Sequence, residues 1–78
     1  MVATVEETEY LKALGERLVA LREAADLSQQ QMAARAGLAR SFYARMEGGS
    51  HNASVGTLRK VAIAHGIGLG ELLAPIDG

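Results

Sequence analysis

The sequence predicts an all-α fold, a single domain of five short helices. Almost half of its 78 residues are apolar, many of them alanine, and only one is proline, which favours helix. Apolar residues near the N-terminus recur at spacings of three and four, the period of an amphipathic helix. Serine and glycine residues stand where helices are expected to begin and end. A domain this short buries a modest core, so a partner subunit would add stability.

The first predicted helix runs from about Tyr10 to Ala25. Its apolar stripe consists of Leu11, Leu14, Leu18, Leu21 and Ala25. Residues 1–10 are expected to form an N-terminal arm. Thr4 and Glu7 have the spacing of a capping box, which would start the helix earlier.

The second predicted helix spans residues 29–36. Ser28 and Gln31 match a capping box, in which each side chain bonds to the other's backbone N–H. Gly37 supplies the left-handed residue that commonly ends a helix. The third helix covers residues 40–48 and is preceded by Ala39, whose side chain offers no capping oxygen.

The fourth helix is capped by Ser54 and extends to His65, with Gly66 at its end. A fifth helix, over residues 69–74, is expected to stop at Pro75. We therefore divide the chain into the arm, a helical domain at residues 11–75 and a tail at residues 76–78.

Residues 28–47 have the features of a helix-turn-helix, two short helices joined by a tight turn that contains glycine. Ala33 is small enough for the two helices to cross closely, and Gly37 tolerates the turn. Tyr43 and Met46 fall on the inward side of the second helix of the pair, and its polar residues fall on the outward side. Periodicity alone would equally describe an ordinary helical hairpin.

Positive charge is concentrated around this hairpin, although the whole chain has a net charge of −1. Residues 28–65 carry five arginines and lysines against one glutamate, a balance of +4, and the remainder carries −5. A basic surface of this kind is typical of nucleic-acid binding. The alternative is that these charges are the solvated faces of ordinary helices.

Several segments, in order and at matching spacing, resemble the Xre-like (lambda-repressor-like) helix-turn-helix family. The matching segments are 14–18, 21–23, 27–29, 37–38, 47–49 and 52–66. Residues 39–43 and 51–54 are further similar to controller proteins of restriction–modification systems. The resemblance covers roughly residues 11–73 and implies a five-helix lambda-repressor-like domain of bacterial or phage origin.

The resemblance implies a transcriptional regulator that binds a palindromic operator as a homodimer, with recognition helix 40–48 in the major groove. The base-reading positions are Arg40, Ser41, Arg45 and Phe42. The phosphate-contacting positions are Gln29, Ser50, His51 and Asn52. For Phe42, contact with a thymine methyl and packing against the preceding helix are both open. Arg22 and Glu47 match a structural ion pair.

Two inward positions hold unusual residues. Tyr43 stands where an aliphatic residue is common, and we expect its ring in the core with the hydroxyl at the surface. His65 replaces a leucine on the core stripe, and we expect a partly buried histidine with a structural or interface role.

An apolar surface near the C-terminus is the expected dimer interface. Its residues are Ile63, Ile67, Leu69, Leu72 and Leu73, with Ile76 as an extension. The same surface could instead bind a toxin, in which case the protein would be an antitoxin-type interaction module with secondary DNA binding.

The chain contains no cysteine, nucleophile–base pair, glycine-rich phosphate loop or cluster of metal ligands, so we expect neither an enzyme nor a metal or other cofactor. Glu6, Glu7 and Glu9 precede any apolar run, unlike a secretory signal. We expect a cytoplasmic, nucleoid-associated protein.

Overall fold

The computed structural model describes residues 5–77, and within them the secondary structure is entirely helical. The helices are α1 (Val5–Ala24), α2 (Gln29–Ala36), α3 (Arg40–Glu47), α4 (Val55–Ala64) and α5 (Leu69–Asp77). The predicted all-α, five-helix fold is confirmed. The described residues contain no helix that is long and apolar enough to span a membrane.

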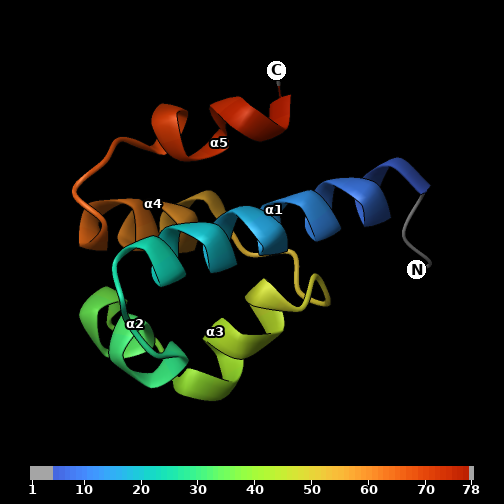
Figure 1. The fold of residues 1–78 in the computed structure, drawn as a ribbon. Helices are drawn as coiled ribbons and strands as arrows, with labels where there is room; N and C mark the ends of the chain where they lie inside the picture. The colour runs from blue at the N-terminus through green and yellow to red at the C-terminus, as the bar shows by residue number, and fades with distance from the viewer. Residues whose placement is uncertain (1–4, 78) are drawn as a thin grey trace.

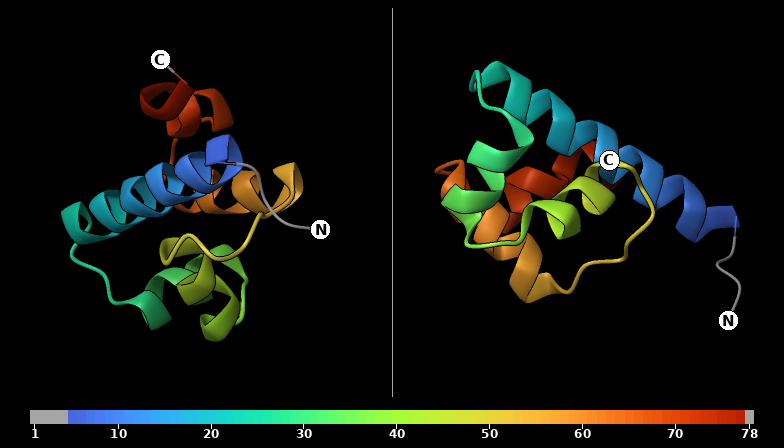
Figure 2. Two further views of the ribbon diagram at one scale, coloured as in Figure 1. Left: turned by 90° about the vertical axis from the view of Figure 1, so that its right-hand side faces the viewer. Right: turned by 90° about the horizontal axis from the view of Figure 1, so that it is seen from below.

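The helices form three tiers. α1 and α4 lie in the middle, with α2 and α3 on one side and α5 on the other (Figures 1 and 2). α1 packs on α3 and α5, α4 packs on α2 and α5, and α2 packs on α3. The α2–α3 pair therefore lies at the end of the molecule opposite α5.

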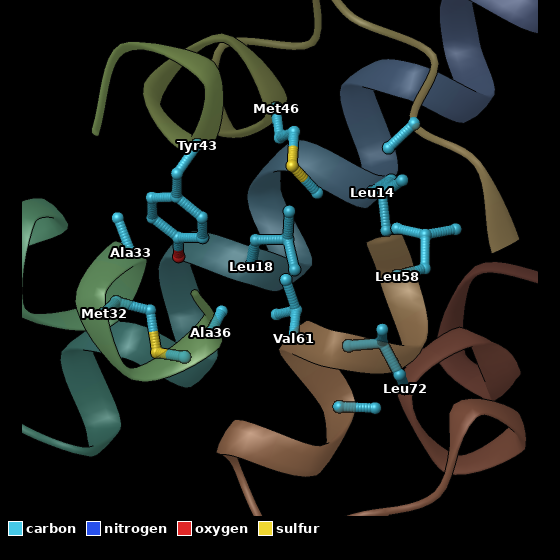
Figure 3. Close-up of a cluster of buried hydrophobic side chains, with 12 residues drawn as sticks. Leu14, Leu18, Met32, Ala33, Ala36, Tyr43, Met46, Leu58, Val61 and Leu72 are labelled. Carbon is cyan, nitrogen blue, oxygen red and sulfur yellow. The ribbon is translucent and has the colours of Figure 1, made fainter. Parts of the chain in front are cut away.

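One apolar core joins all five helices (Figure 3). The largest of its fully buried side chains are Tyr43, Leu18, Met32, Met46, Leu72 and Val61. Leu14 and Leu18 come from the stripe predicted for the first helix, whereas Leu11 and Leu21 of that stripe are only partly buried. Each helix therefore depends on its neighbours to cover its apolar side.

The predicted caps of α2 and α4 are present. Ser28 and Gln31 form both bonds of the capping box, and Gly37 ends α2 with φ 70°. The Ser54 side chain accepts a hydrogen bond from the backbone N–H of Thr57. As predicted, Ala39 starts α3 with no side-chain cap.

The first helix begins five residues before its predicted start and includes most of the expected arm. Val5 to Tyr10 are helical, whereas residues 1–4, with Thr4 of the suggested capping box, lie outside the described part of the chain. Glu6 and Glu7 lie in the first turn, where negative charge interacts favourably with the helix dipole. Because these residues are polar, apolar periodicity does not extend into this part of the helix.

The last helix does not stop at Pro75 but continues to Asp77, so the expected tail is helical as far as the structure describes it. Proline cannot donate to the carbonyl four residues earlier, here that of Glu71. The guanidinium of Arg17 donates to this carbonyl instead, from α1 (3.2 Å). A donor from another helix thus offsets part of the cost of proline inside α5.

Candidate nucleic-acid interface

α2 and α3 form a helix-turn-helix whose turn is closed by backbone bonds. The N–H of Leu38 donates to the carbonyl of Ala33 (2.8 Å) across the left-handed residue Gly37. Ala33 is 1% exposed, in keeping with a small residue where the two helices cross. The turn therefore fixes α3 relative to α2 with no side chain at Gly37 to accommodate.

α3 has one fully buried side and one exposed side. Tyr43 and Met46 are buried in the core, whereas Arg40, Ser41 and Arg45 are exposed. The three polar residues assigned to base reading thus lie on a surface that solvent, and hence a ligand, can reach. Their role in base reading stays a prediction.

The hydroxyl of Tyr43 does not reach the surface, contrary to expectation. The whole residue is buried, and its oxygen has no hydrogen-bond partner among the described residues. Burial raises the pKa of Tyr43, and the nearby carboxylate of Glu47 raises it further. The core therefore encloses the whole side chain of Tyr43, including its hydroxyl.

A partly buried ion pair anchors the C-terminal end of α3. Arg22 of α1 holds both carboxylate oxygens of Glu47, from Nε to Oε2 (2.6 Å) and from Nη2 to Oε1 (3.1 Å). The guanidinium also donates to the carbonyl of Leu27 (2.9 Å). The two side chains are 16% and 4% exposed, so the pair is largely desolvated. Arg22 and Glu47 thereby tie α3 to α1.

The charges of the pair stabilise each other. Burial on its own would raise the pKa of Glu47, but hydrogen bonds from Arg22 and Gln29 outweigh it and lower that pKa. The hydrogen bond to Glu47 raises the pKa of Arg22. Both groups are therefore charged at neutral pH.

Gln29, a predicted phosphate contact, makes an internal bond that the sequence did not reveal. Its Nε2 donates to Oε1 of Glu47 (2.9 Å), so the carboxylate links α1, α2 and α3. An amide nitrogen carries two hydrogens, and the bond to Glu47 uses one. The other hydrogen and the backbone N–H stay available for a phosphate.

The fold explains why position 15, inside α1, is a glycine. A Cβ at this position would collide with the backbone carbonyl of Glu47 and would stand 3.1 Å from that of Met46. Glycine thus lets the end of α3 lie directly against α1. The sequence shows a glycine inside a helix, a signal of close packing, but not the partner that it contacts.

The loop after α3 is attached to α3 at two points. The backbone N–H and the hydroxyl of Ser50 both donate to the carbonyl of Arg45 (3.1 and 3.3 Å). His51 places its ring edge-on to that of Phe42, with centroids 4.5 Å apart. Asn52 is exposed. Ser50 and His51 are thus held beside the predicted base-reading helix, and Asn52 follows them in the loop.

The residues of the predicted dimer surface differ in their exposure to solvent. Ile63 is 64% exposed on α4, and Ile67, Leu69 and Leu73 are partly buried against the core. Leu72 is 0% exposed, so its assignment to the interface is wrong. It faces inward because the helical period turns it toward α1 and α4, away from its neighbour Leu73.

His65 is partly buried, as expected. Its Nε2 is buried without a hydrogen-bond partner in the described residues. Burial lowers the pKa of His65, and the positive charges of Arg17 and Arg35 act in the same direction. Both effects favour the neutral form of the His65 ring.

Comparison with known proteins agrees with this geometry. Residues 13–75 match the model of a helix-turn-helix domain family. The control protein C.MunI of a Mycoplasma species is 41% identical over 64 residues, which cover 81% of this chain and 86% of that protein. An uncharacterized HTH-type transcriptional regulator of Sinorhizobium fredii, y4dJ, is 33% identical over 66 residues, covering 85% of this chain and 86% of that one.

A solved structure agrees as well. The crystal structure of the restriction–modification controller protein C.AhdI from Aeromonas hydrophila superposes with a TM-score of 0.77 at 40% identity. The alignment covers 80% of this chain and 94% of that one. These relatives are regulators, not enzymes. The chain therefore belongs to the helix-turn-helix family of DNA-binding regulators, in the group that resembles restriction–modification controller proteins.

Proposed function

We propose that this regulator binds a palindromic operator as a homodimer and reads the bases with α3. The observation that carries the proposal is the exposure of Arg40, Ser41 and Arg45 on a helix whose opposite side is locked into the core. Each arginine can pair with O6 and N7 of a guanine through two hydrogen bonds. Phe42 lies beside Arg45 on the same helix, half-buried, and the exposed part of its ring could meet a thymine methyl.

Phosphate contacts would hold α3 in register on the duplex. Gln29 lies at the start of α2 with a free amide hydrogen, and Ser50, His51 and Asn52 lie in the loop that is attached to α3. Gln29 and the loop are both bonded to residues near the C-terminal end of α3, Gln29 to Glu47 and Ser50 to Arg45. Phosphate contacts at these positions would fix how that end of α3 sits against the groove.

The dimer would form through the exposed part of the predicted apolar surface, centred on Ile63 and bordered by Ile67, Leu69 and Leu73. A two-fold axis would place this same patch of one subunit against that of the other. Two α3 helices placed about one helical turn of DNA apart (~34 Å) would read two halves of an inverted repeat. Such a regulator acts where the genome lies, at the bacterial nucleoid.

The test is selection of bound sequences from a random DNA library, followed by titration of the selected operator. We expect an inverted repeat. Arg40→Ala and Arg45→Ala should each lower the preference for operator over random DNA by roughly five- to 150-fold. Arg35→Ala removes an exposed arginine of α2 that has no assigned base and serves as the matched control. Operator binding at wild-type strength by both α3 variants would exclude α3 as the reading helix.

The oligomeric state needs a separate measurement. Sedimentation at tens of micromolar should show a dimer, and Ile63→Asp should shift it toward monomer while the helical content is retained. A wild-type monomer, both free and on operator DNA, would exclude the homodimer. A toxin that copurifies in substoichiometric amount from the native host would support the antitoxin alternative instead.

A further inference from the structure

Three side chains beside the reading helix form a connected stack. Phe42 lies on α3, Arg45 lies one turn further along the same helix, and His51 lies in the loop that follows. The ring of His51 meets that of Phe42 at an interplanar angle of 65° and a centroid distance of 4.5 Å, an edge-to-face pair. The guanidinium carbon of Arg45 lies 5.9 Å from the centroid of Phe42, within reach of a cation–π interaction.

The loop also binds Arg45 through its backbone. The N–H and the hydroxyl of Ser50 donate to the Arg45 carbonyl. The main chain of Arg45 therefore holds Ser50, and its side chain lies on the ring that carries His51. Phe42 is half-buried and packs against the core, which restricts the position of its ring.

We propose that Phe42 is a positioning residue, whose ring holds Arg45 and His51 so that the reading helix and the phosphate-contacting loop meet DNA as one preformed surface. The inference rests on the proposed function and deepens it. A free arginine side chain samples many rotamers and loses that freedom on binding. A guanidinium already held over a ring loses less.

The position of Phe42 argues against base contact as its main role. Part of the ring is covered by the core, one part is met by His51, and the guanidinium of Arg45 lies near it. A methyl contact to thymine needs only apolar bulk, whereas the stack needs an aromatic ring. Leucine and tyrosine at this position therefore distinguish the two roles.

The test compares Phe42→Leu with Phe42→Tyr on the selected operator and on random DNA. Phe42→Leu should weaken operator binding roughly three- to tenfold, since the interactions lost are of this size. It should weaken binding to random DNA less, because only the phosphate contact of His51 acts there. Phe42→Tyr should bind like the wild type. Replacing thymine by uracil in the operator removes the methyl group, and it should leave the effect of Phe42→Leu unchanged.

A double-mutant cycle with Arg45→Ala separates action through Arg45 from direct contact. If Phe42 works by holding Arg45, Phe42→Leu costs little more in the Arg45→Ala background. Additive losses, or Phe42→Leu binding at wild-type strength, would overturn the inference. Loss of the Phe42→Leu effect on uracil-substituted operator would identify a methyl contact instead.

Free protein provides a readout that does not depend on DNA. The ring of Phe42 should shift the His51 ring protons in the NMR spectrum, and Phe42→Leu should remove that shift while the melting temperature stays close to the wild type. Unshifted His51 protons in the wild type would overturn the stack. Absence of any operator preference in the wild type would overturn the proposed function, and the positioning role with it.

Discussion

Arg17 of α1 donates a hydrogen bond to the carbonyl of Glu71, the acceptor that Pro75 leaves without its usual helical partner. Its Nε donates to the next carbonyl, that of Leu72 (3.1 Å). One side chain thus attaches α5 to α1 where the helical bonding of α5 is weakest. The α5 tier carries part of the proposed dimer surface, so this attachment also bears on assembly.

Arg17→Ala should therefore loosen α5. We expect a loss of about 1–3 kcal/mol in the free energy of unfolding and faster hydrogen exchange in α5 than in α2. In a Pro75→Ala background the loss should be smaller, since the alanine would supply the backbone N–H that the carbonyl of Glu71 lacks. Equal losses in both backgrounds, measured by denaturant titration, would show that Arg17 does not compensate for Pro75.

Gly15→Ala should destabilise the protein because its Cβ would meet the backbone of Glu47. Backbone cannot rotate away, so α1 and α3 would have to separate, at a cost of about 1–3 kcal/mol. Gly70→Ala is the matched control, since nothing lies within 4 Å of a Cβ there. That variant should be neutral or stabilising by up to about 1 kcal/mol, following helix propensity. Melting curves that rank the two variants in the opposite order would contradict the close approach of α1 and α3.

Glu47→Gln should leave the partly buried guanidinium of Arg22 without its counter-charge. Breaking a fully buried pair from one side costs about 3–5 kcal/mol, so for this partly buried pair we expect a loss of up to about 3 kcal/mol. Replacing both partners, as Arg22→Met with Glu47→Leu, should restore much of the lost stability. If the double variant is no more stable than Glu47→Gln, the loss does not arise from an uncompensated charge.

The same pair predicts acid sensitivity. The pKa of Glu47 is lower in the folded protein than its ordinary value of 4.5. The stabilisation that its charged carboxylate gives the folded state is therefore complete above pH 4.5. This stabilisation is lost as the pH falls through the lower pKa of the folded protein. Urea titrations between pH 6 and pH 3 should show this loss in the wild type and not in the Arg22→Met, Glu47→Leu variant.

His65 should make the stability of the protein depend on pH in a higher range. Its pKa is lowered below 6.5 in the folded protein, so the unfolded chain takes up the proton first. Stability should therefore fall as the pH drops from about 6.5 toward the folded pKa. His65→Leu should remove this dependence and restore an apolar residue to a partly buried position. An unchanged slope between pH 7 and pH 5 in that variant would show that another group titrates there.

Elements that are marked by local chemistry were predictable from the sequence. Ser28, Gly37 and Ser54 delimit helices through contacts within a few residues, and these contacts are present. The inward side of α3 also followed from helical periodicity, through Tyr43 and Met46.

Features that depend on distant partners were not predictable. The continuation of α5 past Pro75 requires Arg17, which lies 54 residues before the carbonyl that it satisfies. The bond between Gln29 and Glu47 likewise joins two helices. The burial of the Tyr43 hydroxyl depends on how tightly several elements pack around it. Helical period separates Leu72 from Leu73, but only the docked position of α5 shows which of them faces the core.

The anchoring of α3 has a mechanical consequence. Glu47 is tied to Arg22 and lies against Gly15, whereas the opposite end of the helix begins at Ala39 without a cap. The last residue of α3 is thus fixed to α1, and Arg40 and Ser41 lie in the first turn of the helix, next to the turn from α2. At 1.5 Å of rise per residue, the start of α3 lies about 10 Å from Glu47. A shift of a few degrees in the packing of α3 on Gly15 would therefore displace the first turn by about half an ångström and change which base edges the proposed reading residues could meet.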